Sequence, residues 1–168
     1  MNNELSIPKT HLIFGYYGCG KTTYLRQLIK DKLQNNLVVC VLTNVYYAKT
    51  YFNKEDKNLH TFTLSDILPF LSDNEKNPTN IAKAIVNCFV SNVCRSNLYT
   101  IAVDEADLHS INSDYSEDEY FRELSKCCKE NKFNLLYTKG IDKKENDSSY
   151  HKIPTIFERF SDIITVLK

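Results

Sequence analysis

The sequence lacks the long apolar segments and targeting signals that mark membrane and secreted proteins. No apolar run approaches the roughly 20 residues that a helix needs to cross a bilayer. The N-terminus, Met-Asn-Asn-Glu-Leu-Ser, has neither a basic start nor an apolar core. We therefore expect no membrane span, no membrane partner and a cytoplasmic location, in the cytosol of a cell or host.

Two further absences concern metal-binding cysteines and net charge. The six cysteines include no C-x-x-C pair, which argues against a zinc ribbon and a thioredoxin-like redox site. We interpret most of them as small buried apolar residues. With 21 basic and 21 acidic residues the formal net charge is zero, so the whole molecule has no electrostatic bias toward nucleic acid. Any contact with DNA must be local or assembled from several subunits.

The chain is long enough for one domain with a substantial core. It has 168 residues, 42% of them hydrophobic and 25% charged, and we predict a single domain over residues 1–168. Residues 12–14 form a short apolar run that predicts a strand, and 21–33 carry apolar side chains at helical spacing. The continuous apolar run at 37–42 is typical of a strand covered on both faces. This β-α-β unit predicts a parallel sheet.

The rest of the chain continues the alternation of helices and strands. Residues 44–78 are the least regular part, and we expect loops there, with a short strand at 59–64 and a helix that starts near Ser65. The later predicted elements are a helix at 78–93, a strand at 99–103, a helix at 116–130 with a capping box of Ser116 and Glu119, a strand at 133–138, a polar loop at 139–152, a short helix at Pro154 and a strand at 163–167. The predicted fold class is α/β, with three layers and a mostly parallel sheet flanked by helices.

A glycine-rich turn lies between the first predicted strand and the first predicted helix. Gly15-x-x-x-x-Gly20-Lys21-Thr22 matches the P-loop (Walker A) pattern in the strand-to-helix context that the pattern requires. The glycines let backbone N–H groups turn inward around a phosphate, and the positive end of the helix faces the same anion. Lys21 then reaches the β- and γ-phosphates, and the Thr22 hydroxyl ligates Mg²⁺. The predicted ATP-binding residues are Gly15, Tyr16, Tyr17, Gly18, Cys19, Gly20, Lys21, Thr22 and Thr23.

Three residues in this loop replace the small residues that are more usual there. Tyr16 and Tyr17 pack over the nucleotide, pack against a neighbouring subunit, or cover the edge of the sheet. Cys19 would lie among inward-facing amides and near Lys21, and we predict that it is the most reactive cysteine. Bound Mg-ATP should then protect it from alkylation.

An acidic pair supplies the metal anchor that a P-loop needs on a nearby parallel strand. The apolar run Ile101-Ala102-Val103 ends in Asp104-Glu105, a Walker B pattern. We predict that Asp104 holds Mg²⁺ and that Glu105 orients or deprotonates the attacking water. The pair favours hydrolysis of ATP over phosphoryl transfer to a small molecule.

The small number of arginines supports the same choice. Small-molecule kinases close an arginine-rich lid over the phosphates, because guanidinium groups neutralise charge while water is excluded. The arginines of this chain are few and scattered, at Arg26, Arg95, Arg122 and Arg159.

The order of these elements and motifs resembles a known family. Residues 15–22, Val103-Asp104-Glu105-Ala106 and the tail 153–164 together resemble the additional-strand (ASCE) P-loop NTPases. The resemblance is closest to the FtsK/HerA-type ATPases, which include genome-packaging ATPases of double-stranded DNA viruses and the Zot-like proteins of filamentous phages. It implies an ATPase with ATP and Mg²⁺ as cofactors, which moves or packages double-stranded DNA as a homo-oligomeric ring.

The resemblance also assigns roles that the motifs alone do not. The family carries a glutamine sensor where this chain has Thr138-Lys139-Gly140, so either Thr138 or Lys139 takes that role, or the chain belongs elsewhere. In the family's rings, an arginine of one subunit reaches the nucleotide of the next. That arginine would be Arg159 or, as the alternative, Arg122, although the sequence favours a surface or helix-capping role for either of them. The predicted catalytic residues are Lys21, Glu105 and Arg159.

Two other function classes stay open. The chain also resembles thymidine kinase, through the P-loop, the acidic pair with Glu105 as base toward a nucleoside, and the segment 139–142, although that enzyme's zinc-binding cysteine pairs are absent. The other class is a regulatory nucleotide-binding module, in which hydrolysis is slow and a partner reads the bound state.

A cluster of tyrosines follows the second predicted strand. Tyr46, Tyr47 and Tyr51, with Lys49 and Lys54, form either a basic aromatic patch for single-stranded nucleic acid or a buried insertion beside the sheet.

Overall fold

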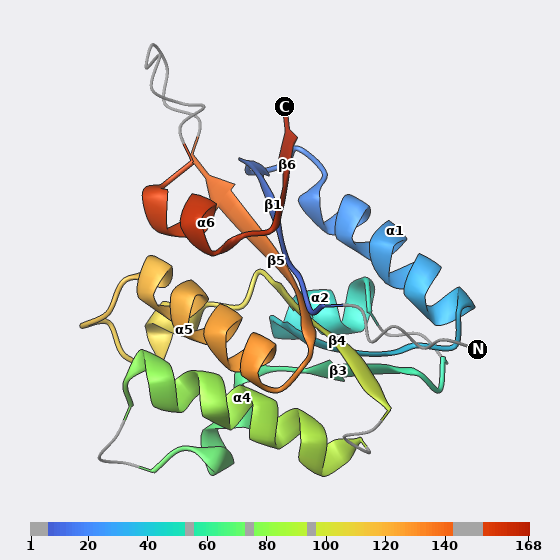
Figure 1. The fold of residues 1–168 in the computed structure, drawn as a ribbon, viewed down its shortest axis with the longest axis horizontal. Helices are drawn as coiled ribbons and strands as arrows, with labels where there is room; N and C mark the ends of the chain where they lie inside the picture. The colour runs from blue at the N-terminus through green and yellow to red at the C-terminus, as the bar shows by residue number, and fades with distance from the viewer. Residues whose placement is uncertain (1–6, 53–55, 73–75, 94–96, 143–152) are drawn as a thin grey trace.

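The computed structural model describes residues 7–52, 56–72, 76–93, 97–142 and 153–168, and it consists of six strands and the helices that connect them (Figure 1). The strands are β1 (Thr10–Tyr16), β2 (Val38–Thr43), β3 (Leu59–Phe62), β4 (Leu98–Asp104), β5 (Asn134–Ile141) and β6 (Ile163–Leu167). The α-helices are α1 (Lys21–Gln34), α2 (Val45–Thr50), α3 (Leu64–Ile67), α4 (Pro78–Asn92), α5 (Glu117–Glu130) and α6 (Thr155–Phe160). Two short 3₁₀ helices complete the set, η1 (Leu68–Phe70) and η2 (Leu108–Ser110).

The six strands form one sheet in the order β3-β2-β4-β5-β1-β6. Every neighbouring pair is parallel, so the carboxyl ends of all six strands meet at one edge of the sheet. The predicted α/β class with a parallel sheet is confirmed. One strand, β5, lies between β1 and β4, and it therefore separates the P-loop strand from the strand that ends in Asp104.

Helices cover both faces of the sheet and make three layers. In Figure 1, α1 lies on one side of the strands, whereas α4, α5 and α6 lie on the other. The side chains of each strand alternate between the two cores: Leu12 and Phe14 pack with the helices of the α4–α6 side, and Ile13 packs with Leu25 and Ile29 of α1. Strands buried on both faces explain the continuous apolar runs in the sequence.

Most predicted elements are present with small shifts of their ends. The capping box of α5 is formed by Ser116 and Glu119, and the helix near Ser65 begins at Leu64 behind a second capping box. Pro154 lies just before α6, as its N-cap, rather than within its first turn. None of the described helices is long and apolar enough to cross a membrane.

Two predictions about loops are wrong. Residues 45–50 form α2, because the Asn44 side chain accepts a hydrogen bond from the Tyr47 amide (2.7 Å) and caps this turn. The polar loop expected from Lys139 begins later, because β5 stays paired with β1 up to Ile141 opposite Tyr16. Residues 143–152 of that loop lie outside the described residues.

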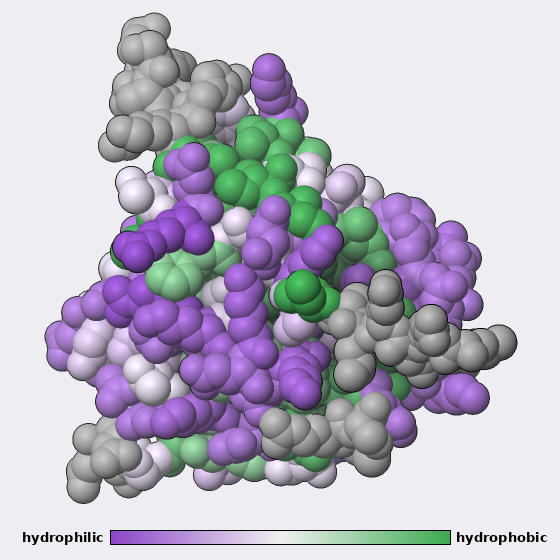
Figure 2. Space-filling view, viewed as in Figure 1, coloured by the Kyte–Doolittle hydropathy of each residue, from purple (hydrophilic) through white to green (hydrophobic). Residues whose placement is uncertain are grey.

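The surface is uneven in polarity. Figure 2 shows hydrophilic side chains over α5 and a gathering of apolar side chains around β6. On β6, Ile163 is 41% exposed and Val166 is 43% exposed. Within the described chain β6 pairs only with β1, so its other side is an open edge of the sheet.

Candidate functional site

The turn between β1 and α1 has the backbone shape of an anion cradle. Gly18 and Gly20 have positive φ values of 81° and 93°, a left-handed conformation that glycine adopts without steric cost. Gly20 is the N-cap of α1 and provides no side-chain cap. The first amides of α1 are therefore left without a capping side chain, as an anion-binding helix terminus requires.

The first glycine of the motif is required by close packing. A Cβ atom on Gly15 would lie 2.6 Å from the carbonyl oxygen of Leu167 and 2.7 Å from Cys19 Sγ. Gly15 is paired with β6 through Leu167, so the last strand holds the base of the turn. Any side chain here would push the turn away from β6.

Lys21 is folded back over this turn. Its side chain is nearly buried, at 4% exposure, and its Nζ atom donates a hydrogen bond to the Tyr16 carbonyl (2.7 Å). Nζ also lies 4.0 Å from Cys19 Sγ and 5.2 Å from the centre of the Tyr17 ring. The ammonium group thus lies beside the cradle, where a phosphate would accept hydrogen bonds from it.

Asp104 is fully buried at the end of β4. Its Oδ1 atom accepts a 2.6 Å hydrogen bond from the Thr138 hydroxyl on β5, whereas Oδ2 has no hydrogen-bond partner among the described residues. Burial raises the pKa of Asp104, and the Thr138 hydrogen bond, the nearby Thr22 hydroxyl and the charge of Lys21 oppose that rise. A buried carboxylate oxygen without a partner, close to a threonine hydroxyl, is a donor set that fits Mg²⁺.

Glu105 occupies the next position in an unusual backbone conformation. Its φ is +51°, a left-handed value that is uncommon for a residue with a side chain. The Asn44 side chain donates a hydrogen bond to its carbonyl oxygen (3.4 Å). Burial and the neighbouring Asp104 charge raise the pKa of Glu105, against the opposing charge of Lys21.

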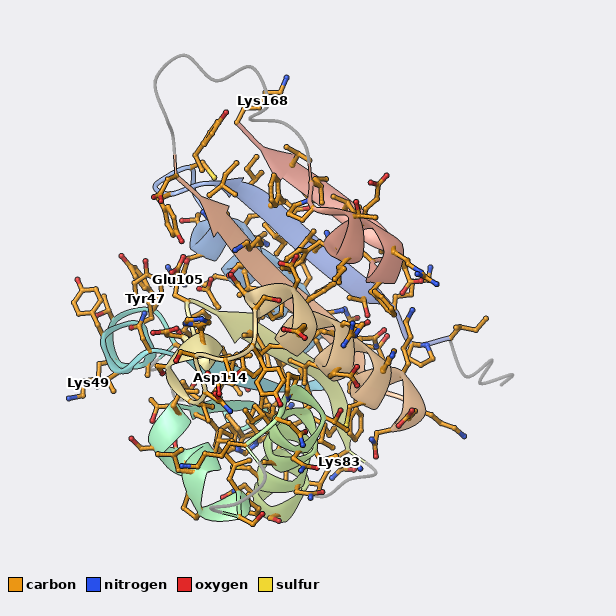
Figure 3. The ribbon with its side chains drawn as sticks, turned by 90° about the vertical axis from the view of Figure 1, so that its left-hand side faces the viewer. Tyr47, Lys49, Lys83, Glu105, Asp114 and Lys168 are labelled. Carbon is orange, nitrogen blue, oxygen red and sulfur yellow. The ribbon has the colours of Figure 1, made fainter. Side chains whose placement is uncertain are left out.

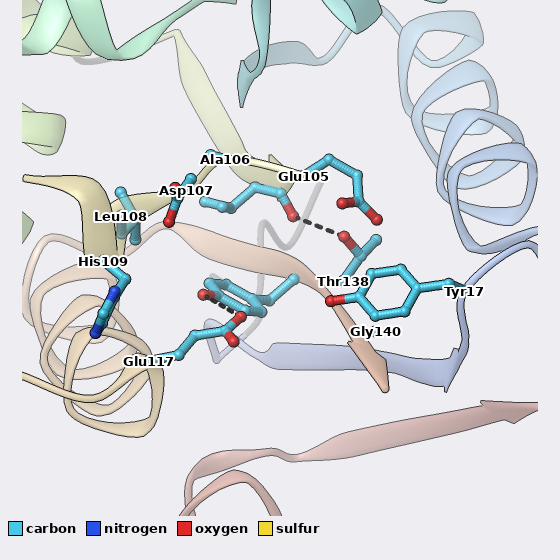
Figure 4. A pocket seen from close by; sticks show the side chains of 11 residues that line it. Tyr17, Glu105, Ala106, Asp107, Leu108, His109, Glu117, Thr138 and Gly140 are labelled. Atoms are coloured by element: carbon cyan, nitrogen blue, oxygen red, sulfur yellow. Dashed lines mark hydrogen bonds between the residues drawn. The ribbon is translucent and has the colours of Figure 1, made fainter. Parts of the chain in front are cut away.

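Glu105 lines three cavities, and two of them adjoin the P-loop or β5. One, of about 190 Å³, is lined by Lys21, Thr22, Tyr47, Tyr51 and the glycines of the turn, and we call it the P-loop cavity. The other, of about 200 Å³, lies between the ends of β4 and β5. Figure 4 shows its lining, with Glu105 and Tyr17 at one end and His109 and Glu117 at the other. Glu105 therefore faces space on both sides.

Comparisons with known proteins agree with this arrangement at the level of the fold. A solved structure of an ATPase domain matches with a TM-score of 0.58 and 14% sequence identity, over 95% of this chain and 69% of that chain. No family model and no curated protein matches the sequence. The chain has the fold of a P-loop NTPase domain.

Of the two candidate sensors in this P-loop fold, only one contacts the acidic pair. Thr138 donates its hydrogen bond to Asp104. The neighbouring Lys139 forms an ion pair with Glu117 of α5 and lies 5.7 Å from the centre of the Phe157 ring. Thr138 is therefore the candidate whose side chain adjoins the predicted metal ligand.

Tyr17 covers the edge of the sheet. A Cβ atom on Gly140 would lie 2.6 Å from the Tyr17 ring, so the ring packs directly on the β5 backbone. The side chain is nevertheless 58% exposed. It stands between the cradle and the cavity of Figure 4, and whether it also covers a nucleotide stays a prediction.

The cysteines of the P-loop chain differ sharply in accessibility. Cys19 is partly exposed, whereas Cys40, Cys88, Cys127 and Cys128 are buried. Burial raises the pKa of Cys40 to about 12 and that of Cys88 to about 11, which disfavours their reactive thiolate forms. The sixth, Cys94, lies outside the described residues. The predicted reactivity of Cys19 stays a prediction.

The arginines that the structure describes are not gathered at the cradle. Arg159 on α6 is exposed and lies 5.8 Å from the centre of the Phe160 ring. Arg122 donates to Glu123 at 3.0 Å. In the described chain neither lines any of the three cavities at Glu105, so any contact of Arg159 with a nucleotide would have to come from a neighbouring copy.

Sequence reasoning missed that Tyr47 and Tyr51 line the P-loop cavity together with Lys21 and Thr22. A signal existed, because these tyrosines follow the carboxyl end of β2, and in a parallel sheet all such ends share one edge. The sequence indicates Gly140 only through the resemblance to known families. Its contact with Tyr17 could not be predicted, because that contact depends on the register between β1 and β5.

Proposed function

We propose that this chain binds Mg-ATP and hydrolyses it. The observation that carries the proposal is the environment of Asp104, whose buried Oδ2 atom has no partner among the described residues. The same carboxylate is within electrostatic reach of Lys21 and close to the Thr22 hydroxyl. This supports the proposal, because the phosphate cradle lies near a carboxylate oxygen that could bind a metal ion. One triphosphate with its metal ion requires both groups.

Each residue has a distinct task in this proposal. The amides of the glycine turn and of the first turn of α1 bind the β-phosphate, and Lys21 neutralises charge between the β- and γ-phosphates. Thr22 and Asp104 would hold Mg²⁺, which supplies charge neutralisation on the β- and γ-phosphate oxygens when it is bound. Glu105 orients the attacking water and accepts its proton. The raised pKa of Glu105 makes it a stronger base than an ordinary carboxylate.

The finer proposal is that the ATPase is a subunit of a motor that packages or translocates double-stranded DNA. The family resemblance supports it, and so does the exposed position of Arg159, which leaves its guanidinium available to a neighbouring subunit in a homo-oligomeric ring. Because the net charge is zero, a central channel would have to collect one or two lysines from every subunit to attract DNA.

One experiment tests the motor. The rate of phosphate release from ATP is measured with and without duplex DNA, alongside the mass in solution. The proposal expects DNA to raise the rate and the protein to form a salt-sensitive oligomer. A monomer of 19.5 kDa whose turnover ignores DNA would contradict the motor. Lys21→Ala should abolish turnover, and Lys83→Ala, at an exposed lysine of α4, is the matched control.

The kinase alternative has one specific observation in its favour. The cavity of Figure 4 lies beside Glu105, has a volume of about 200 Å³ and carries polar groups from Tyr17, His109, Glu117 and Thr138. It offers room for a small acceptor on the γ-phosphate side. Transfer of phosphate to thymidine, lost in Glu105→Gln, would select this alternative. If the protein instead retains bound nucleotide through purification and hydrolyses it at a negligible rate, the result would support a regulatory nucleotide-binding module.

A further inference from the structure

Helix α2 presents a group of tyrosines beside the P-loop cavity. The rings of Tyr47 and Tyr51 are 4.9 Å apart at an interplanar angle of 90°, and Tyr46 lies 6.0 Å and 6.4 Å from them. Tyr47 and Tyr51 line the P-loop cavity, whereas Tyr46 is 65% exposed. We call these three residues the tyrosine platform. It runs from the inside of the cavity to open solvent.

The position of the platform determines which molecule can use it. Tyr47 is in the electrostatic field of Glu105 and Asp104 and lies close to the Thr22 hydroxyl. These are the groups proposed to face the γ-phosphate and its metal ion. The ribose of a nucleotide in the cradle is attached to the α-phosphate, at the opposite end of the polyphosphate, and it carries the base. A ring that stacks on the platform therefore belongs to a second molecule.

The charges near the platform indicate the kind of second molecule. Lys49 is exposed on α2, and Figure 3 shows it on the outer side of this helix, with Tyr47 on the side toward Glu105. The guanidinium of Arg26 lies 5.5 Å from the centre of the Tyr51 ring. Aromatic faces flanked by cations are suited to a strand whose bases stack and whose phosphates contact the basic groups.

We propose that the tyrosine platform binds the bases of single-stranded nucleic acid, with Lys49 and Arg26 contacting its phosphates. The exposed Tyr46 ring offers the first stacking face. Single-stranded rather than duplex nucleic acid is required, because the flat faces of paired bases are already stacked and covered. The acidic Glu105 and Asp104 lie at the inner end, so the strand's phosphates remain at the outer end with Lys49.

The location of the platform would allow a bound strand to influence ATP hydrolysis through Tyr47. Tyr47 belongs both to the platform and to the lining of the P-loop cavity, next to Thr22 and Glu105. The Tyr47 hydroxyl can donate a hydrogen bond toward a γ-phosphate held in this cavity. A strand that fixes the Tyr47 ring would also fix this donor. This consequence rests on the proposed ATPase, but binding of the strand does not.

Binding is measured with a fluorescein-labelled dT₁₂ oligonucleotide and no nucleotide present, against an abasic oligonucleotide of the same length and charge. The proposal expects dT₁₂ to bind at least tenfold more tightly than the abasic strand. Tyr46→Leu and Tyr51→Leu should each weaken dT₁₂ binding by roughly tenfold, since stacking on an aromatic side chain has about that effect per base. Tyr99→Leu is the matched control, because Tyr99 also has a cation, Lys32, over its ring. It lies at the start of β4, away from the platform, which follows the carboxyl end of β2.

Three results would overturn the proposal. One is equal affinity for dT₁₂ and the abasic strand, and another is unchanged dT₁₂ binding by both platform variants. The third is a loss of ATP affinity in Tyr51→Leu without a loss of tripolyphosphate affinity, which would mean that the platform holds the base of the P-loop nucleotide. Lys21→Ala should bind dT₁₂ as the unsubstituted protein does. If ATP turnover is absent while dT₁₂ binding persists, the ATPase proposal fails and the platform stands.

Discussion

The P-loop cavity has two walls of opposite character. One wall consists of the glycine turn with Lys21, which is 4% exposed, and of Glu105 at the end of β4, next to the fully buried Asp104. The other wall is α2, a helix of six residues with no buried side chain, on which Tyr46 is 65% exposed. The first wall is held by backbone geometry and by the sheet. The second is held by one cap, by contacts between rings and by the packing of Tyr47 and Tyr51 against the α1 side of the sheet.

This difference separates two kinds of task. Groups that meet a polyphosphate and a metal ion must be fixed and partly dehydrated, because charges interact more strongly where water is excluded. Groups that meet a large second molecule must remain accessible. The buried wall is therefore suited to chemistry and the exposed wall to recognition, and substitutions on the two walls should have different consequences.

The largest expected effect is on the buried wall, at Asp104. Asp104→Asn removes the charge that would hold Mg²⁺ while preserving the shape of the side chain. Because a bound metal contributes several kcal/mol to transition-state stabilisation, ATP turnover should fall by at least about a hundredfold, measured as phosphate release under saturating Mg-ATP.

The matched control for this variant is Asp114→Asn, at an exposed aspartate ahead of α5. It should leave turnover unchanged. If Asp104→Asn is as active as the unsubstituted protein, Asp104 does not bind the metal ion.

The next effect concerns the backbone of the same wall. In Gly15→Ala the new methyl group would lie 2.6 Å from the Leu167 carbonyl oxygen, and a backbone atom cannot move aside as a flexible side chain can. We expect a loss of about 1–3 kcal/mol in the free energy of unfolding, measured by urea denaturation. In Gly140→Ala the nearest atoms to the new methyl group belong to the exposed Tyr17 ring, which can move, so this variant should cost less. The reverse order would mean that β6 does not fix the turn.

The exposed wall is tested by removing the cap of α2. The Asn44 side chain accepts from the Tyr47 amide and donates to the Glu105 carbonyl. Asn44→Ala should therefore lower the free energy of unfolding by about 1 kcal/mol and also reduce ATP turnover severalfold. Asn77→Ala removes the corresponding cap of α4, where Asn77 accepts from the Asn80 amide.

The two cap variants should be similarly destabilised, but only Asn44→Ala should lose turnover. If both variants keep full activity, α2 does not support Glu105.

The smallest effect is on pH dependence. The Thr138 hydrogen bond favours the charged form of Asp104, so Thr138→Val should raise the pKa of that carboxyl further. In the proposed site the ionised carboxylate is the metal ligand, so we expect activity to be lost as the pH falls through this pKa. The acid limb of the turnover profile should thus move to higher pH in Thr138→Val. Thr155→Val, on exposed α6 surface, should leave the limb in place, and an unshifted limb in Thr138→Val would contradict the assignment.

The pKa shifts also predict how stability depends on pH without Mg²⁺. Burial raises the pKa values of Asp104 and Glu105 above those of the unfolded chain. The folded state therefore binds more protons, and stability falls as the pH rises through the raised values. Asp104→Asn should weaken this decline.

The buried wall could be predicted from the sequence because its constraints are local. Gly18 and Gly20 need left-handed backbone conformations, and the position of Lys21 follows from the helix that starts beside them. Asp104 was predictable as an acidic residue at the end of an apolar run. Its hydrogen bond with Thr138 was not, because that contact requires β5 to lie beside β4, and spacing along the chain does not give strand order.

The exposed wall could not be predicted in the same way. Val45, Tyr46 and Tyr47 are weak helix formers, and α2 exists through the Asn44 cap and packing of Tyr47 and Tyr51 against the α1 side of the sheet. These contacts depend on the tertiary structure. The likeness to a solved ATPase domain supports the fold, and it leaves the roles of individual residues to experiment.

The central claim is that one polyphosphate, with its metal ion, spans Lys21 and Asp104. Calorimetric titration of ATP with Mg²⁺ and with EDTA tests it most directly, in the unsubstituted protein and in Asp104→Asn. The claim predicts that Mg²⁺ tightens ATP binding to the unsubstituted protein, and that this effect of Mg²⁺ is lost in Asp104→Asn. An effect of Mg²⁺ that is the same in both proteins would contradict it.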